Sequence, residues 1–289
     1  CPHHPLLQEL ERDVDRILSV LDDPASRLGV AAAFLYLPVW RGEFPRIRQL
    51  LDELTPSLQG SALSPRSLVT WRVIEGNYAW NTSNWEQARE KLQEALSVIE
   101  TFGIHVFKPM VWGLQTYAAL AAGDDQEAER LADCARTVTQ LHQRLGLGQH
   151  SYYRAGIALM SGDHHSARDH ASRALDTMLP LGLPTFTSIC RVGLAKILAD
   201  VGETAMAREQ LHLALESARL TGSRMIEAHG HLTMAQVLIK DGQVQEAEAS
   251  LREGLRIARA LDCLTLDYWW RPAVMAELFA RALEAGIEA

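Results

Sequence analysis

The stretch VGETAMAREQL at residues 201–211 begins with a glycine turn and continues as a helix, with an alanine five residues after the glycine. The same arrangement recurs in AGDDQEAERLA at 122–132, SGDHHSARDHA at 161–171 and DGQVQEAEASL at 241–251. Successive glycines of these four stretches are separated by 39, 40 and 40 residues. A fixed spacing of this size is typical of a protein built from repeated structural units.

Two earlier stretches extend the series. NTSNWEQAREKLQEAL at 81–96 has Ser83 where the others have glycine, and WRGEFPRIRQLL at 40–51 has Gly42. Five residues after the turn the helices carry Ala88, Ala128, Ala167, Ala207 and Ala247, and twelve residues after it Ala95, Ala135, Ala174, Ala214 and Gly254. These offsets share one helix face. Side chains this small let a neighbouring helix approach to the short end of the usual packing distance, about 8–10 Å.

A second break falls roughly twenty residues after each turn. It is marked by glycine at Gly103, Gly182 and Gly222, and Gly146 is slightly displaced from the register. We therefore expect GLGQ at 146–149 to be a connection between helices. Each unit becomes a helix, a turn and a second helix, which is an antiparallel hairpin. The sequence predicts an all-α protein, a right-handed α-solenoid of six such hairpins.

The pattern resembles the tetratricopeptide repeat. Besides the glycine turn and the alanines after it, small residues stand seven positions before four of the turns, at Gly76, Ala155, Ala195 and Ala235. The period exceeds the usual value of about 34 residues, so the pattern is most similar to the long-repeat variant in the sensor domains of large bacterial transcription activators. The resemblance implies tetratricopeptide-like hairpins over residues 26–262, preceded by a linker or capping helix at 1–25.

Residues 263–289 abandon the repeat pattern. WWRPAVMAELFARALEAGIE at 269–288 is similar to the segment that closes the repeat region in activators related to the maltose-regulon activator and the antibiotic-regulatory proteins. We expect residues 263–289 to form a capping helix and a junction to a missing domain. In such activators a nucleotide-binding module precedes the solenoid and a DNA-binding domain lies beside it, so the resemblance implies that DNA binding belongs to that missing domain.

Composition narrows the function classes. The chain has 36 acidic and 28 basic side chains, a net charge of −8, whereas nucleic-acid affinity comes mainly from Lys and Arg that neutralise phosphates. We expect this chain to make no direct nucleic-acid contact. The sequence contains no run of 18 apolar residues, the length that would predict a membrane span. The four cysteines, Cys1, Cys134, Cys190 and Cys263, form no CxxC pair, which indicates reduced thiols in a cytoplasmic protein.

The sequence offers no catalytic constellation. His164, His165 and His170 lack the i, i+4 spacing of a helical metal site, and CPHHP at 1–5 is interpreted as a linker or tag-like segment. No phosphate-binding loop or nucleophile elbow is present. We therefore predict a protein that is not an enzyme and has no catalytic residue, metal or cofactor. An α-helical enzyme with dispersed acids is the weakest alternative.

The inner wall of the solenoid is the predicted binding surface. The resemblance implies that the first helix of each hairpin lines a concave groove, and one column of these helices is more polar and more varied than the packing columns. The candidate groove residues are Tyr36, Asn77, Tyr117, Tyr152, Tyr153, Lys196, His229, Thr233 and Gln236. Their expected ligand is a protein domain, a peptide or a small-molecule effector.

We thus predict a non-catalytic sensor or scaffold domain of a bacterial multidomain transcriptional regulator, in which ligand binding changes the superhelix and biases the rest of the protein. The alternative is a free-standing adaptor that binds peptides or proteins.

Overall fold

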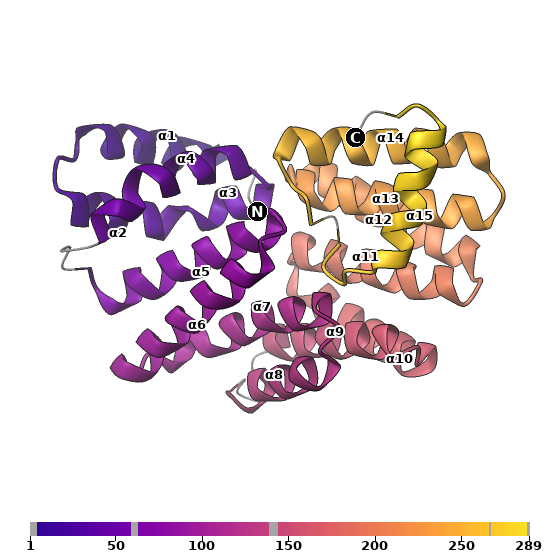
Figure 1. The fold of residues 1–289 in the computed structure, drawn as a ribbon, viewed down its shortest axis with the longest axis horizontal. Coiled ribbons are helices and arrows are strands. Elements are labelled where there is room, and N and C mark those ends of the chain that lie inside the picture. The colour runs from indigo at the N-terminus through magenta and orange to yellow at the C-terminus, as the bar shows by residue number, and fades with distance from the viewer. Residues whose placement is uncertain (1–4, 59–62, 139–143, 266, 288–289) are drawn as a thin grey trace.

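The computed structural model describes residues 5–58, 63–138, 144–265 and 267–287, and the regular structure in these ranges is helical throughout. The helices are α1 (Pro5–Val20), α2 (Pro24–Phe34), α3 (Tyr36–Arg41), α4 (Phe44–Leu54), α5 (Pro65–Asn81), α6 (Trp85–Phe102), α7 (Lys108–Ala121), α8 (Asp125–Val138), α9 (Arg144–Met160), α10 (His164–Met178), α11 (Pro184–Asp200), α12 (Thr204–Thr221), α13 (Arg224–Lys240), α14 (Val244–Leu261) and α15 (Pro272–Glu284). From α5 to α14 consecutive helices pair as hairpins, and the hairpins follow one another along an arc (Figure 1). The predicted all-α solenoid is confirmed.

The turns follow the register that the glycines predict. Gly123 and Gly202 have φ of 72° and 82°, in the left-handed region that glycine enters without a steric penalty, and Ser83 adopts φ 59° in the equivalent turn. The alanines five residues after the turns are buried. Ala88, Ala128, Ala167 and Ala207 are 0 % exposed and Ala247 is 3 % exposed. Glycine therefore sets the chain reversal, and alanine sets the close contact between neighbouring helices.

We expect the same substitution to have opposite effects at two glycines. Gly202→Ala should lower the free energy of unfolding by about 1 kcal/mol, because a Cβ at φ 82° is strained although it would meet no atom within 4 Å. Gly29→Ala should raise the free energy of unfolding by about 0.5–1 kcal/mol, because Gly29 lies in the interior of α2 with equally open space. Urea unfolding of both variants checks the signs, and equal signs would contradict these turn and helix assignments.

One local prediction was wrong. α9 begins at Arg144, so Gly146–Gln149 lie in a helix and not in a connection. Glycine there has a packing purpose, because a Cβ at Gly148 would lie 2.7 Å from the side chain of Met178 on α10. The first inner helix is divided into α2 and α3, because Pro38 has no N–H to donate to the carbonyl of Phe34.

The two ends of the solenoid touch each other. One hydrophobic cluster includes residues of α1–α5 together with residues of α13–α15. A Cβ at Gly42 would lie 3.0 Å from the side chain of Leu261, and Arg48 forms an ion pair with Asp262. In most solenoids each repeat contacts only its neighbours. Here the two ends are in contact, so the inner helices surround a common centre, where the candidate site lies.

Candidate functional site: an occupied groove and an uncharged pocket

Part of the concave face is covered by the chain itself. Residues 263–265 and 267–271, which we call the strap, lie between α14 and α15 in the sequence and cross between the two halves of the solenoid (Figure 1). The backbone N–H groups of Leu264 and Thr265 donate to the carbonyl of Asn81 at 2.8 and 3.0 Å. The Thr265 hydroxyl donates to the carbonyl of Trp80. The strap therefore supplies donors to carbonyls at the C-terminal end of α5, which a helix leaves without intrahelical partners.

The second half of the strap is held by buried charges. Lys196 on α11 forms an ion pair with Asp267, and their side chains are 2 % and 6 % exposed. Burial lowers the pKa of Lys196, and the nearby Asp267 carboxylate opposes this change. Arg271 donates to Asp200 on α11 and to Gln236 on α13, both at 2.9 Å. These contacts join the strap to two successive hairpins.

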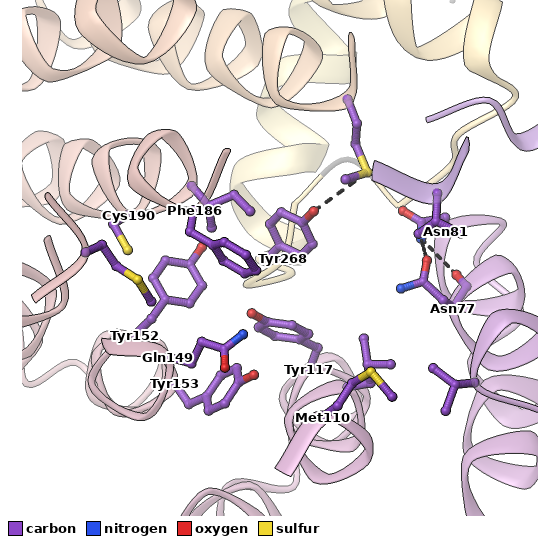
Figure 2. A pocket seen from close by; sticks show the side chains of 16 residues that line it. Asn77, Asn81, Met110, Tyr117, Gln149, Tyr152, Tyr153, Phe186, Cys190 and Tyr268 are labelled. Carbon is purple, nitrogen blue, oxygen red and sulfur yellow. Dashed lines mark hydrogen bonds between the residues drawn. The ribbon is translucent and has the colours of Figure 1, made fainter. Parts of the chain in front are cut away.

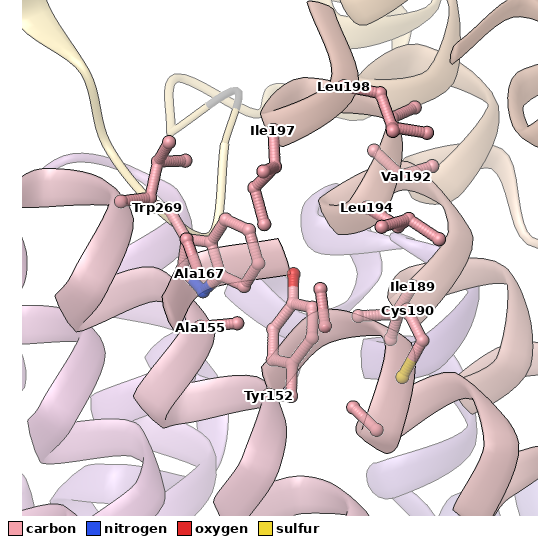
Figure 3. Packing of buried hydrophobic residues seen from close by; sticks show 14 of the residues in the cluster. Tyr152, Ala155, Ala167, Ile189, Cys190, Val192, Leu194, Ile197, Leu198 and Trp269 are labelled. Carbon is pink, nitrogen blue, oxygen red and sulfur yellow. The ribbon is translucent and has the colours of Figure 1, made fainter. Parts of the chain in front are cut away.

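Trp269 fits a slot made by two glycines. It is 0 % exposed and stacks on Tyr152, with ring centroids 4.5 Å apart. A Cβ at Gly156 would lie 2.4 Å from its Nε1, and a Cβ at Gly193 would lie 2.7 Å from its ring. Figure 3 shows the indole among residues of α9 and α11. Both glycines are therefore required by the strap and not by a turn.

Three of the predicted groove residues contact the strap, and Thr233 is buried on the same helix as two of them. Lys196 and Gln236 bond to the strap as described above. His229 is 4 % exposed, with its ring 5.1 Å from the ring of Tyr268. The Thr233 hydroxyl donates to the carbonyl of His229. Tyr36 begins α3, and its side chain lies outside the described part of the structure. Ligand binding by these five residues stays a prediction.

The other four predicted residues come together in one pocket. Asn77, Tyr117, Tyr152 and Tyr153 line a cavity of about 110 Å³ at the centre of the concave face (Figure 2). Tyr117 contacts Tyr153 and Tyr268, both at ring centroid distances of 5.4 Å. The remaining lining residues are Val39, Val73, Asn81, Met110, Leu114, Gln149, Met178, Phe186, Ile189, Cys190 and Met225. Inner helices from α3 to α13 thus converge on a single site, completed by Tyr268 of the strap.

The residues that line the pocket carry no charge at neutral pH. None of them is Asp, Glu, Lys, Arg or His. Burial raises the pKa of Tyr117, Tyr152, Tyr153 and Tyr268 further above its usual value, and raises the pKa of Cys190 to about 12. The pocket therefore offers aromatic rings, thioethers and neutral amides, and neither a general base nor a thiolate.

Asn81, Phe186, Met225 and Tyr268 also line the pocket and were not among the predicted groove residues. For Asn81 the sequence contains a signal, a polar residue at a fixed position of the repeat. Asn81 lies two residues before the Ser83 turn, where other units have Ala121, Met160, Asp200 or Lys240. The side chains of Asn81 and Asp200 both contact the strap, through Cys263 and Arg271 respectively. Tyr268 lies outside the repeat, where periodicity gives no register.

The histidines singled out by the sequence do not form a cluster. His165 is exposed beside Asp169, and His164 is half-buried at the start of α10. Residues 1–4 of CPHHP are outside the described ranges. Within those ranges, no group of three or more His, Cys, Asp or Glu side chains could hold a metal ion. Within the same ranges, no helix has the length and apolar character needed to span a membrane.

The burial of His229 predicts a pH dependence of stability. Burial, assisted by the positive charge of Lys196, lowers its pKa from 6.5 to about 4. Between these values the unfolded chain binds a proton that the folded protein does not, so stability is lost as the pH falls below about 6.5. We expect this residue to reduce the free energy of unfolding by about 2 kcal/mol from pH 7.5 to pH 5.0. Urea unfolding at both pH values should show a smaller loss for His229→Gln, and an equal loss would contradict this assignment.

Comparisons with known proteins agree with the fold. No family model and no curated protein matches the chain. Chains of solved structures do match, and two Rap structures are among them. The apo form of RapI is 12 % identical, with a TM-score of 0.52, and the match covers 91 % of this chain and 72 % of that one. A Rap protein complexed with competence and sporulation factor is 16 % identical, with a TM-score of 0.60 and the same coverage. At such identities the likeness shows the fold alone, a tetratricopeptide-like helical solenoid.

Proposed function

We propose that this chain is a non-catalytic binding domain whose ligand, a peptide or protein segment or a small effector, is held in the uncharged pocket of the concave face. The observation that carries the proposal is the convergence of inner helices from α3 to α13 on one open pocket, while the strap covers the neighbouring groove. A similar fold in a Rap protein complexed with competence and sporulation factor supports it. The neutral lining supports binding over acid–base catalysis, which needs a titratable group near the reacting atoms.

We further propose that the domain works as a sensor or scaffold of a cytoplasmic bacterial transcriptional regulator, in which a separate domain binds DNA. The repeat length and the segment after residue 262 support this context. A free-standing adaptor would use the same fold and pocket. The reading frame on both sides of this chain distinguishes them, because a regulator requires a flanking DNA-binding domain and an adaptor has none.

The pocket is tested with Tyr117→Ala, because the Tyr117 ring contacts two other rings of the wall. Ligands are captured from an extract of the source cells on the immobilised chain and identified by mass spectrometry. Their affinities are then measured with purified components. We expect Tyr117→Ala to weaken binding at least tenfold, which corresponds to about 1.4 kcal/mol, and to retain the parent's circular dichroism.

The matched control is Phe102→Ala, which removes a ring that is 58 % exposed on α6 and does not line the pocket. Its affinity should equal that of the parent. A ligand that binds Tyr117→Ala as tightly as the parent would exclude the pocket as its site.

A further inference from the structure

We infer that the pocket is a subsite for one uncharged, ring-sized group bearing a single hydrogen-bonding edge, of the phenol or indole type, and that it excludes charged groups of the same shape. The inference deepens the proposed function and depends on it for one premise only, that the pocket is where ligand binds. Size, wall chemistry and charge each support it.

The size of the pocket fits one ring. Its volume is about 110 Å³. An apolar cavity of about 150 Å³ is large enough to hold benzene, and the present cavity is open at one side. The present cavity is smaller, so a single ring fits if part of it remains in the mouth, and a bicyclic ring extends further into the mouth. Two stacked rings or a bulky saccharide would not fit without movement of the wall.

The wall suits an aromatic guest. Tyr117 lies edge-on to Tyr153, with an interplanar angle of 76°, and is tilted by 37° against Tyr268. Aromatic pairs favour such edge-to-face and offset arrangements at centroid distances of about 4.5–7 Å. A further ring in the cavity would continue this cluster. Met110, Met178 and Met225 complete the lining, and their thioethers make favourable contacts with ring edges.

Besides the tyrosine hydroxyls and the Cys190 thiol, the polar groups of the pocket are neutral amides. The Asn81 amide donates at 2.8 Å to both the carbonyl and the side-chain oxygen of Asn77. Gln149 reaches in among Tyr117, Tyr152 and Tyr153 (Figure 2). An amide offers both a donor and an acceptor. A phenol hydroxyl or an indole N–H can therefore form a hydrogen bond with one of these amides without any ionic partner.

A charged guest would lose its hydration without gaining a counter-charge. The charges that hold the strap are already paired with one another, Lys196 with Asp267 and Arg271 with Asp200. Lys196 lies over the ring of Trp269, and that ring stacks on Tyr152 of the pocket wall. Transfer of an unpaired ion into such surroundings is strongly unfavourable. The pocket should therefore discriminate by charge among ligands of equal size.

The experiment titrates the intact chain with probes matched in shape and different in charge, by protein-observed NMR at pH 7. Benzyl alcohol is compared with benzylammonium, and benzamide with benzoate. We expect each neutral probe to bind at least tenfold more tightly than its charged partner. Equal affinity within both pairs, tighter binding of benzylammonium, or no binding by any of the four probes would overturn the inference.

Two further arms locate the site and identify the source of the ring. Cys190→Phe fills the pocket from α11 and should abolish probe binding. If that variant does not fold, Phe186→Ala tests the same site. It removes a half-buried ring from the lining and should weaken probe binding. Unchanged binding by either folded variant overturns the assignment. N-acetyltyrosinamide binding more tightly than 4-methylphenol identifies a peptide side chain as the source, and the reverse order identifies a free aromatic molecule.

Failure here is distinguishable from failure of the proposed function. Captured ligand that depends on Tyr117, together with equal affinity for neutral and charged probes, would overturn the ligand class alone. If the pocket discriminates among the probes but the captured ligand binds Tyr117→Ala as tightly as the parent, the proposed function is overturned. The inferred chemistry of the pocket then still holds.

Discussion

Replacing Ala207 with arginine is expected to lower the free energy of unfolding by about 4 kcal/mol or more, or to prevent folding. Ala207 is 0 % exposed on the face where α12 packs against its neighbours. A long side chain there must separate closely packed helices, which alone costs about 1–3 kcal/mol. The guanidinium would also be buried without a partner, one of the few mechanisms that give such large effects.

The matched control is Ala205→Arg, two positions earlier on the same helix and exposed to solvent. Its free energy of unfolding should lie within about 0.5 kcal/mol of the parent's. Urea unfolding followed by circular dichroism measures both variants. If the two arginines had similar effects, the packing role of the repeated alanines would be wrong. Ala247→Arg and Ala249→Arg repeat the comparison on α14, where the first alanine is buried and the second exposed.

The repeated part of the fold could be predicted because its contacts are local and periodic. A hairpin packs on its neighbour about 40 residues away, so the same alanine is required in each unit and the pattern is visible in one sequence. Ser83 illustrates the strength of the register. It takes the left-handed conformation, φ 59°, that glycine adopts in the equivalent turns, although its side chain makes this conformation costly.

Contacts that occur once leave no periodic signal. The strap pairs Lys196 with Asp267 and Asn81 with Thr265, which are 71 and 184 positions apart. Gly156 and Gly193 are required because Trp269 packs on them, a reason that only the tertiary structure reveals. The repeat register alone predicts that Tyr117, Tyr152 and Tyr153 face the groove. That Tyr268 would join them depends on the path of a segment outside the repeat.

Lys196→Met should lower the free energy of unfolding by about 3–5 kcal/mol, because it leaves the Asp267 carboxylate buried without its close partner and with only the Arg271 Nε, 3.8 Å away, as a counter-charge. Only 2 % of the Lys196 side chain and 6 % of the Asp267 side chain are exposed, so water cannot replace the lost ammonium group. Asp267 also accepts the backbone N–H of Trp269 at 3.0 Å. The loss should therefore weaken the strap as a whole.

The double variant Lys196→Met with Asp267→Asn tests whether the buried charge is the cause. Asparagine keeps an oxygen for the Trp269 N–H and removes the unpaired charge, so most of the lost stability should return. Lys240→Met is the surface control. Its ammonium group also contacts a strap partner, Asp200, at 2.9 Å, but 38 % of its side chain is exposed, and such pairs contribute about 0–1 kcal/mol. Equal losses for Lys196→Met and Lys240→Met, or a double variant no more stable than Lys196→Met, would show that a buried ion pair does not hold the strap in the groove.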